Sequence, residues 1–287
     1  MKIFKTTELN KINIDQIRFL FKDSFGKLPS EKQLISKYTS GFQGFSFHCL
    51  FFNSKDFLVG SFTLIPKKFI YKKKEIVGLH LIDTCFPYTG KVNPFTIKKA
   101  LFKTINYCSK FIDYNLFLYG FPNKKIIKLW DVLLNWHHVD SLHSMIDLSP
   151  IMTILSKRFQ SDDENTLLLK NPNLSYNPRL FSFKNSTLNF GESGFINIWF
   201  IRKIIPIQIV DQLSLLSKPN FSKGINMFKI WRLFIPSIIC HNESSKKYFW
   251  HYSLKKDHFP IFILDNDKIF NLKELVLKSS FLWNDVP

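Results

Sequence analysis

An apolar run, a helix-like segment and a second apolar run follow one another between residues 74 and 121. The runs at 74–86 and 115–121 have the length and composition of buried strands. Between them, Asn93 is a suitable N-cap and Pro94 a suitable first residue for an amphipathic helix. A strand, a crossover helix and a second strand are typical of a parallel pair. We therefore expect two parallel strands whose carboxyl ends lie at the same edge of a sheet.

The neighbouring segments predict the rest of an α/β fold. Residues 14–25 and 30–38 have helical spacing, with Asn13 and Ser30 as the expected N-caps. Short apolar or alternating runs separated by turns indicate an antiparallel meander at 45–52, 56–71 and 74–86. One more helix and one more strand are predicted at 123–134 and 136–146. The expected fold is a mixed, mostly antiparallel sheet flanked by helices.

The pattern changes beyond about residue 150. Residues 161–180 are rich in Asn, Asp, Ser and Pro, which predicts a linker or a long ordered loop. From Gly194 onward, short apolar runs with turn residues between them indicate a second α/β or sheet-rich unit. We expect a first domain at 1–150, a linker or long loop at 151–180, and a smaller C-terminal α/β domain at 181–287.

Basic residues outnumber acidic ones. The 287 residues include 40 Lys and Arg against 22 Asp and Glu, a net charge of +18. Such a charge attracts phosphates, nucleic acid or an anionic membrane face, and peripheral contact with such a membrane is one expectation. Nucleic acid is disfavoured, because few of the basic residues are Arg and no helix-turn-helix, zinc or RNP pattern is present.

The location in the cell is inferred from several missing signals. The 4 cysteines have neither CxxC spacing nor the density of a disulfide scaffold. The N-terminal segment has no apolar core typical of a signal peptide, and no window approaches the length needed to span a bilayer. We therefore expect a cytoplasmic protein.

Two segments carry the most specific pattern in the chain. HLIDTCFPYTGKVNPFTIKKALF spans residues 80–102, and YGFPNKKIIKLWDVLLNW spans residues 119–136. Together they resemble the acyl-CoA motif and the following strand and helix of the GNAT (GCN5-related) N-acyltransferases, especially a bacterial subgroup with a GFPN element. The resemblance covers about the first half of the chain, and GFPN at 120–123 is its more specific part. It implies a GNAT-like sheet, and the C-terminal unit would be a degenerate second half, as in the tandem FemX-like transferases.

The turn after the first parallel strand is the expected acyl-CoA site. A helix start presents unpaired N–H groups to an anion, Gly90 permits close backbone approach, and Lys91 adds positive charge. The resemblance implies that this anion is the diphosphate of acetyl-CoA or another acyl-CoA, with the pantetheine arm along the strand backbone. The residues expected at this site are Thr84, Cys85, Thr89, Gly90, Lys91, Val92 and Asn93.

The resemblance implies direct attack of an amine on the thioester carbonyl, which needs a base and a proton donor. His80 and Asp83 lie on the strand that ends near Cys85, and His80 is favoured because imidazole titrates near neutral pH. Strict alternation along a strand puts these two side chains on opposite faces. Tyr119 is a candidate acid, and Asn123 a candidate hydrogen-bond donor near the thioester or the acceptor. His80, Asp83 and Asn123 each also have a purely structural alternative.

The leading hypothesis is a cytoplasmic, acyl-CoA-dependent N-acyltransferase that acts on a small-molecule amine. The subgroup suggests a nucleotide- or lipid-linked amino sugar of surface-polysaccharide biosynthesis. One alternative is a catalytically degenerate GNAT-fold binding protein, because Thr89 replaces the usual Arg and Val92 the usual Gly or Ala. A FemX-like aminoacyl transferase is a second, and a nucleic-acid-binding module ranks last. No metal site is expected, since His137, His138 and His143 lack metal-binding spacing and nearby ligands.

Overall fold

The computed structural model describes most of the first half of the chain and the strands of the second half. The described residues are 1–87, 92–122, 127, 136–147, 166–169, 187–190, 195–202, 205–212, 237–242, 251–253, 259–265 and 268–278. None of the helices within these ranges is long and apolar enough to cross a lipid bilayer.

The two predicted N-terminal helices are present. α1 (Lys11–Phe25) begins at Asn10, whose side chain accepts a hydrogen bond of 2.8 Å from the amide of Asn13. Asn13 was the expected N-cap, and that prediction is wrong by one turn, because the Asn13 amide is the group that is capped. α2 (Glu31–Tyr38) begins with the capping box predicted at Ser30. Both helix starts are thus fixed by local side-chain hydrogen bonds.

The first half of the chain forms one edge of the sheet and the predicted parallel pair of strands. Its elements include β1 (Lys2–Lys5), the 3₁₀ turn η1 (Thr6–Glu8), β2 (Phe47–Phe52), β3 (Leu58–Tyr71), β4 (Lys74–Cys85), α3 (Pro94–Cys108) and β5 (Leu116–Gly120). The strands β1 to β4 pair antiparallel in chain order. β2, β3 and β4 are the predicted meander, whereas β1 was not predicted. α3 then reverses the chain, so that β5 runs parallel to β4. The predicted strand, helix and strand are therefore confirmed.

The second half of the chain continues the same sheet. β13 (Phe259–Leu264) lies between β5 and β6 (His137–Asp147) and is antiparallel to both. β7 (Thr166–Leu169) pairs with β3 inside the stretch predicted as a linker or loop. The remaining strands are β8 (Thr187–Phe190), β9 (Phe195–Arg202), β10 (Ile205–Gln212), β11 (Ser237–Asn242), β12 (His251–Ser253) and β14 (Val276–Lys278). One sheet thus includes strands from all three predicted parts, 1–150, 151–180 and 181–287. The boundaries between these parts stay a prediction.

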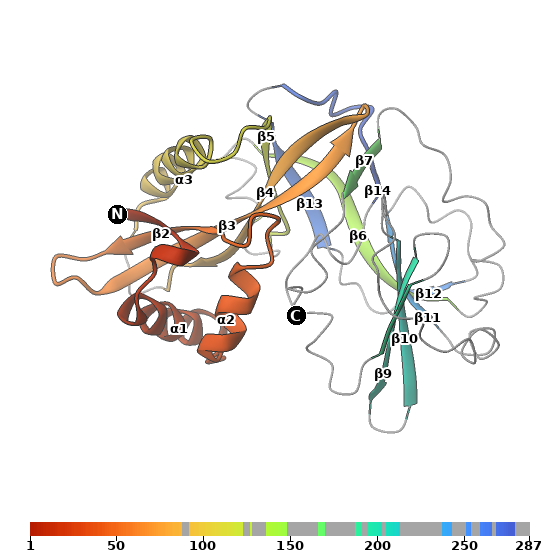
Figure 1. Ribbon diagram of the computed structural model, residues 1–287, viewed down its shortest axis with the longest axis horizontal. Coiled ribbons are helices and arrows are strands. Elements are labelled where there is room, and N and C mark those ends of the chain that lie inside the picture. The colour runs from red at the N-terminus through yellow and green to blue at the C-terminus, as the bar shows by residue number, and fades with distance from the viewer. Residues whose placement is uncertain are drawn as a thin grey trace.

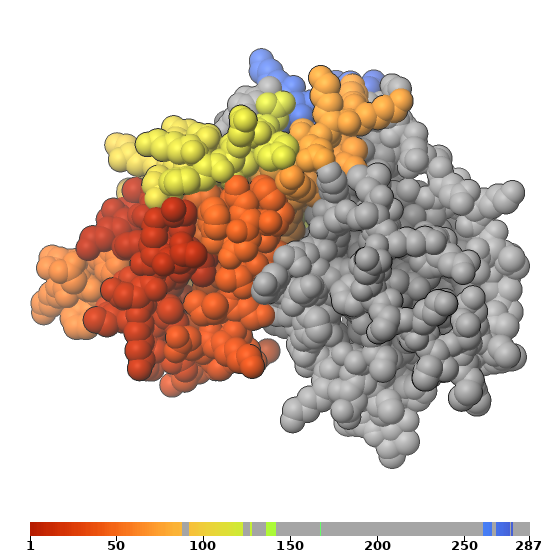
Figure 2. All heavy atoms as spheres, viewed as in Figure 1, coloured from red at the N-terminus to blue at the C-terminus, as the bar shows by residue number. Residues whose placement is uncertain are grey.

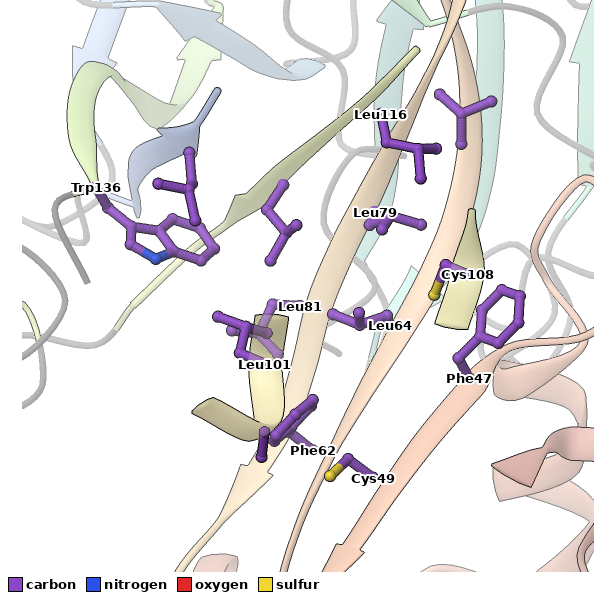
Figure 3. Packing of buried hydrophobic residues seen from close by; sticks show 14 of the residues in the cluster. Phe47, Cys49, Phe62, Leu64, Leu79, Leu81, Leu101, Cys108, Leu116 and Trp136 are labelled. Atoms are coloured by element: carbon purple, nitrogen blue, oxygen red, sulfur yellow. The ribbon is translucent and has the colours of Figure 1, made fainter. Parts of the chain in front are cut away.

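Helices cover both faces of the first half of the sheet (Figure 1). On one face, Leu101 of α3 packs with Leu79 and Leu81 of β4, as Figure 3 shows. On the other face, Ile17 of α1 and Leu34 of α2 pack in a cluster that includes residues of β2, β3 and β4. Burying one such side chain stabilises the fold by roughly 1.5–3 kcal/mol. The helix predicted at 123–134 lies outside the described residues except for position 127.

Candidate functional site

The pairing between the parallel strands β4 and β5 ends before β4 itself ends. β4 and β5 pair up to His80 and Tyr119, and β5 stops one residue later at Gly120. β4 continues to Cys85, and within the described ranges no strand pairs with this last part on the β5 side. The end of β4 therefore has backbone N–H and C=O groups directed toward the space beyond β5.

A β-bulge interrupts β4 in the same place. On the β3 side, Ser61 lies opposite Cys85 and Thr63 lies opposite Ile82, so β4 has one residue more than β3 between the two pairs. Asp83 lies in this bulge with a φ of 48°, in the left-handed region that Asp tolerates better than most residues. The bulge bends the strand and changes the direction of the side chains after it.

The bulge brings His80 and Asp83 to the same face of the sheet. Ile65, the partner of His80 on β3, belongs to the cluster covered by α1 and α2, and Asp83 contacts α2 directly. The expectation that these side chains lie on opposite faces is therefore wrong. Simple alternation fails because the bulge inserts one residue between His80 and Cys85. The bulge could not be predicted, since residues 80–85 contain no glycine or proline.

An ion pair links α2 to the bulge. Lys37 Nζ donates a hydrogen bond of 2.7 Å to Asp83 Oδ1, with side chains only 11% and 9% exposed. The second carboxylate oxygen, Oδ2, is buried, and the buried Tyr38 hydroxyl is a hydrogen-bond donor beside this carboxylate. Burial, and then the negative charge of Asp83, raise the pKa of Tyr38 well above its usual value. Lys37 and Tyr38 were not found by sequence reasoning, since they belong to no motif.

His80 is packed among aromatic rings. Its ring lies parallel to that of Tyr119, with centroids 4.7 Å apart and an interplanar angle of 7°. Phe121 meets it edge-on at 5.5 Å, and His80 is 1% exposed. The fold thus brings together the predicted base and the predicted acid, Tyr119, but it leaves the imidazole less accessible than the carboxylate of Asp83.

A second buried histidine lies on the same face, two strands away. His48 is on β2, with Nε2 2.9 Å from Thr6 Oγ1 and Nδ1 3.0 Å from Thr63 Oγ1. Burial lowers the pKa of His48 to about 3, so the ring is neutral in the folded protein. Because both ring nitrogens are engaged by hydroxyl groups, His48 stabilises the fold between β2 and β3.

The start of α3 differs from the expected phosphate site. Asn93 Oδ1 accepts a hydrogen bond of 2.9 Å from the amide of Phe95, and the Asn93 carbonyl accepts from the amides of Thr96 and Ile97. Pro94 has no N–H group. The amides expected to be free for an anion are therefore already bonded, because Asn93 caps the helix as well as beginning it.

The other predicted acyl-CoA residues have separate outcomes. Thr84 is partly buried, and Val92 packs against the core beneath α3. Burial raises the pKa of the Cys85 thiol to about 12, which leaves its backbone as the group with a binding role. Thr89, Gly90, Lys91 and Asn123 lie outside the described residues. Among the residues that are described, no three His, Cys, Asp or Glu side chains form a group that could hold a metal ion.

Solved structures resemble the whole chain in fold. A GCN5-related N-acetyltransferase from Anabaena variabilis has a TM-score of 0.59 and 11% identity, over 92% of this chain and 73% of that one. One from Kribbella flavida has a TM-score of 0.57 and 8% identity, over 91% and 71%. No protein-family model and no curated protein matches the sequence. The chain therefore has the mixed α/β fold of these acetyltransferases, as the sequence motifs predicted.

Proposed function

We propose that this protein is an N-acyltransferase that moves an acyl group, acetyl in the first instance, from acyl-CoA to an amine. One observation supports the proposal above the others: β4 continues past its pairing with β5, from Leu81 to Cys85. An extended chain with amide groups, such as the pantetheine arm of CoA, can bond to such a strand end as another strand would. The fold shared with N-acetyltransferases agrees with this assignment.

The acyl-CoA half of the site would use the end of β4 and the turn after it. The backbone of Thr84 and Cys85 would pair with the pantetheine arm. Since the Asn93 cap occupies the first amides of α3, the diphosphate would bind the backbone of the turn at residues 89–91, with Lys91 supplying charge. Binding at the helix itself would require the Asn93 side chain to give up its hydrogen bond to Phe95.

The acceptor half would lie on the α2 side of β4. Asp83 Oδ2 is a buried carboxylate oxygen whose neighbouring donor is the neutral Tyr38 hydroxyl, and the ammonium group of an acceptor would supply a charged donor. We assign Asp83 this binding role, and we assign His80 the removal of the proton, directly or through a water molecule. Lys37 would hold the other oxygen of Asp83 in place.

The reaction follows from these roles. The acceptor ammonium loses a proton to the base, and its nitrogen attacks the thioester carbonyl carbon. A C–N bond forms and the C–S bond breaks. The CoA thiolate leaves and takes up a proton, and the attacking nitrogen gives up its second proton, which restores the proton donor. Tyr119 is the proposed donor of that proton, and Asn123 would hydrogen-bond the thioester or the acceptor. We propose a cytoplasmic reaction on an amino sugar carried by a nucleotide or lipid, following the GFPN resemblance. FemX-like aminoacyl transfer would use a different acyl donor.

A second candidate is a GNAT-fold protein that binds a ligand without turnover. The capped start of α3 and the partly buried Val92 favour it, because both occupy positions where a diphosphate would need free backbone. The two functions differ in one measurable property. An enzyme must bind acyl-CoA and release CoA thiol in the presence of an amine, whereas the degenerate protein releases none.

Calorimetry with acetyl-CoA tests the proposal. We expect saturable binding by the unaltered protein, and loss of binding in Gly90→Val with an unchanged circular dichroism spectrum. Thr89→Val separates side chain from backbone, since it alters a side chain of the same turn and keeps the backbone free. It should retain binding if the diphosphate uses the backbone, and lose binding if it uses the Thr89 hydroxyl. No binding at millimolar acetyl-CoA would exclude the enzyme. Equal affinity of Gly90→Val and the unaltered protein would show that the turn is not the site.

Release of free thiol from acetyl-CoA, measured over a panel of amines, then tests the acceptor. Amino sugars are expected to be the best substrates, and Asp83→Asn should raise the KM for the amine more than it lowers kcat. If simple alkyl amines or aminoacyl donors react faster than every amino sugar, the proposed acceptor class is wrong, although acyl transfer itself would stand.

A further inference from the structure

The exposed side of α3 is basic, and the helix itself contains no acidic residue. From residue 84 to residue 112 there is no Asp or Glu, whereas five lysines occur. The structure describes four of these lysines: Lys98, Lys99, Lys103 and Lys110. None of the four forms an ion pair with a described residue. α1 is different, because Asp15 and Asp23 lie among its basic residues and Asp15 pairs with Arg18. The exposed charge on α3 is therefore entirely positive, whereas that on α1 is mixed.

Three residues of α3 form a continuous exposed stripe. Phe95, Lys99 and Lys103 are four residues apart, which places them on one side of the helix. The Phe95 side chain is 70% exposed, the largest exposure among the described large apolar residues. Figure 2 shows α3, in yellow, at the surface of the molecule. An exposed phenyl ring at one end of a basic stripe is unusual for a surface that contacts only water.

One more exposed lysine and one more exposed aromatic ring follow the end of the helix, before the exposed Asp113. Lys110 is exposed, and the ring of Phe111 beside it is 40% exposed with Lys5 Nζ 4.5 Å from its centroid. Exposed aromatic rings thus lie beyond both ends of a row of lysines on a helix about 22 Å long. We call Phe95, Lys99, Lys103, Lys110 and Phe111 the α3 surface.

We propose that the α3 surface docks on an anionic phospholipid bilayer, with the lysines at the headgroups and Phe95 inserted among them. The lysines match the negative surface charge of such a membrane, and a phenyl ring gains free energy by leaving water at the interface. A convex helix surface fits a plane, whereas single-stranded nucleic acid needs a groove that follows its backbone. This role is independent of acyl transfer and needs no acyl-CoA.

Sedimentation of the full chain with lipid vesicles tests the proposal. We expect binding to vesicles that contain about a third phosphatidylglycerol, none to pure phosphatidylcholine, and a decrease with added salt. Lys99→Glu/Lys103→Glu should weaken binding by about tenfold or more, since two attractive charges become repulsive. Phe95→Ser should weaken binding to the vesicles, and added salt should abolish the binding that remains. The matched control is Lys22→Glu/Lys32→Glu, which makes the same charge change on α1 and α2 and should retain most of the binding.

Three results would overturn the proposal. The first is equal weakening by the control pair, which would show that only net charge matters. The second is tighter, salt-dependent binding of unrelated oligonucleotides than of vesicles, with the same loss in Lys99→Glu/Lys103→Glu, which would assign the surface to nucleic acid. The third is loss of acetyl-CoA binding by that variant while vesicle binding stays unchanged, which would make the lysines part of the acyl-CoA site.

Discussion

Lys37 Nζ lies 2.7 Å from Asp83 Oδ1, and this contact joins α2 to the bulge of β4 through two side chains that are about nine-tenths buried. Removing only the carboxylate would leave a buried ammonium group without its partner. For Asp83→Ala we therefore expect a loss of about 3 kcal/mol in the free energy of unfolding, measured with urea. Asp83→Asn should cost about 1 kcal/mol, because Asn keeps an acceptor for Lys37 and also tolerates the left-handed backbone.

The double variant Lys37→Met/Asp83→Asn serves as the control for this ion pair. It should be more stable than Lys37→Met alone, since Lys37→Met leaves a buried carboxylate unpaired. If the loss of unfolding free energy in the double variant equals the sum of the losses in Lys37→Met and Asp83→Asn, the contact between Lys37 and Asp83 does not contribute to stability.

The stacking of His80 on Tyr119 allows packing and proton transfer to be separated. His80→Phe keeps a flat ring at the stack but removes both nitrogens. We expect a change in unfolding free energy of about 1 kcal/mol and a decrease in kcat for acyl transfer of about 10²- to 10⁴-fold. His80→Ala, in contrast, should lower stability as well, because it leaves a cavity among aromatic rings.

The pH profile of kcat provides the second measurement for His80. The residual activity of His80→Phe should depend on pH differently from the activity of the unaltered protein, because the imidazole that receives the proton is absent. An unchanged kcat in His80→Phe would mean that the ring is structural and that Asp83 or water receives the proton.

The sequence predicted the parts of the fold that depend on local signals. The capping box at Ser30, the Asn93-Pro94 start of α3 and the parallel pair around it are all present in the structure. These elements are fixed by residues within a few positions of one another, so a single sequence contains the needed information.

Features that depend on distant residues were not predictable. The bulge at Asp83 is defined by the register between β3 and β4, and its ion pair requires Lys37, 46 positions earlier. β13 enters the sheet between β5 and β6 although more than 100 residues separate it from either along the chain. Nothing in a short apolar strand specifies which partner it will choose, so the sequence predicted strands there but not their place.

Gly78 is packed too closely for any side chain. A Cβ atom there would lie 2.6 Å from Phe117 Cζ and 2.6 Å from Phe69 Cε2. Both rings belong to one buried cluster, so neither can move without disturbing its neighbours. We expect Gly78→Ala to destabilise the protein by about 1–3 kcal/mol in chemical denaturation. Adding Phe117→Leu should recover part of this loss, and the absence of any recovery would contradict the proposed clash.

His48 makes a prediction for the dependence of stability on pH. Burial lowers its pKa from 6.5 to about 3 in the folded protein, whereas the unfolded chain binds the proton near pH 6.5. Between these values the unfolded state binds more protons, so stability is greatest above pH 6.5 and falls as the pH is lowered toward 3. The full effect is on the order of 5 kcal/mol. His48→Gln keeps hydrogen-bonding groups for Thr6 and Thr63 but cannot take up the proton.

Urea denaturation at several pH values should therefore show a shallower decrease in stability for His48→Gln. The exposed His138, changed to Gln, should leave the decrease unaltered. Parallel pH curves for His48→Gln and the unaltered protein would mean that carboxylates alone cause acid unfolding.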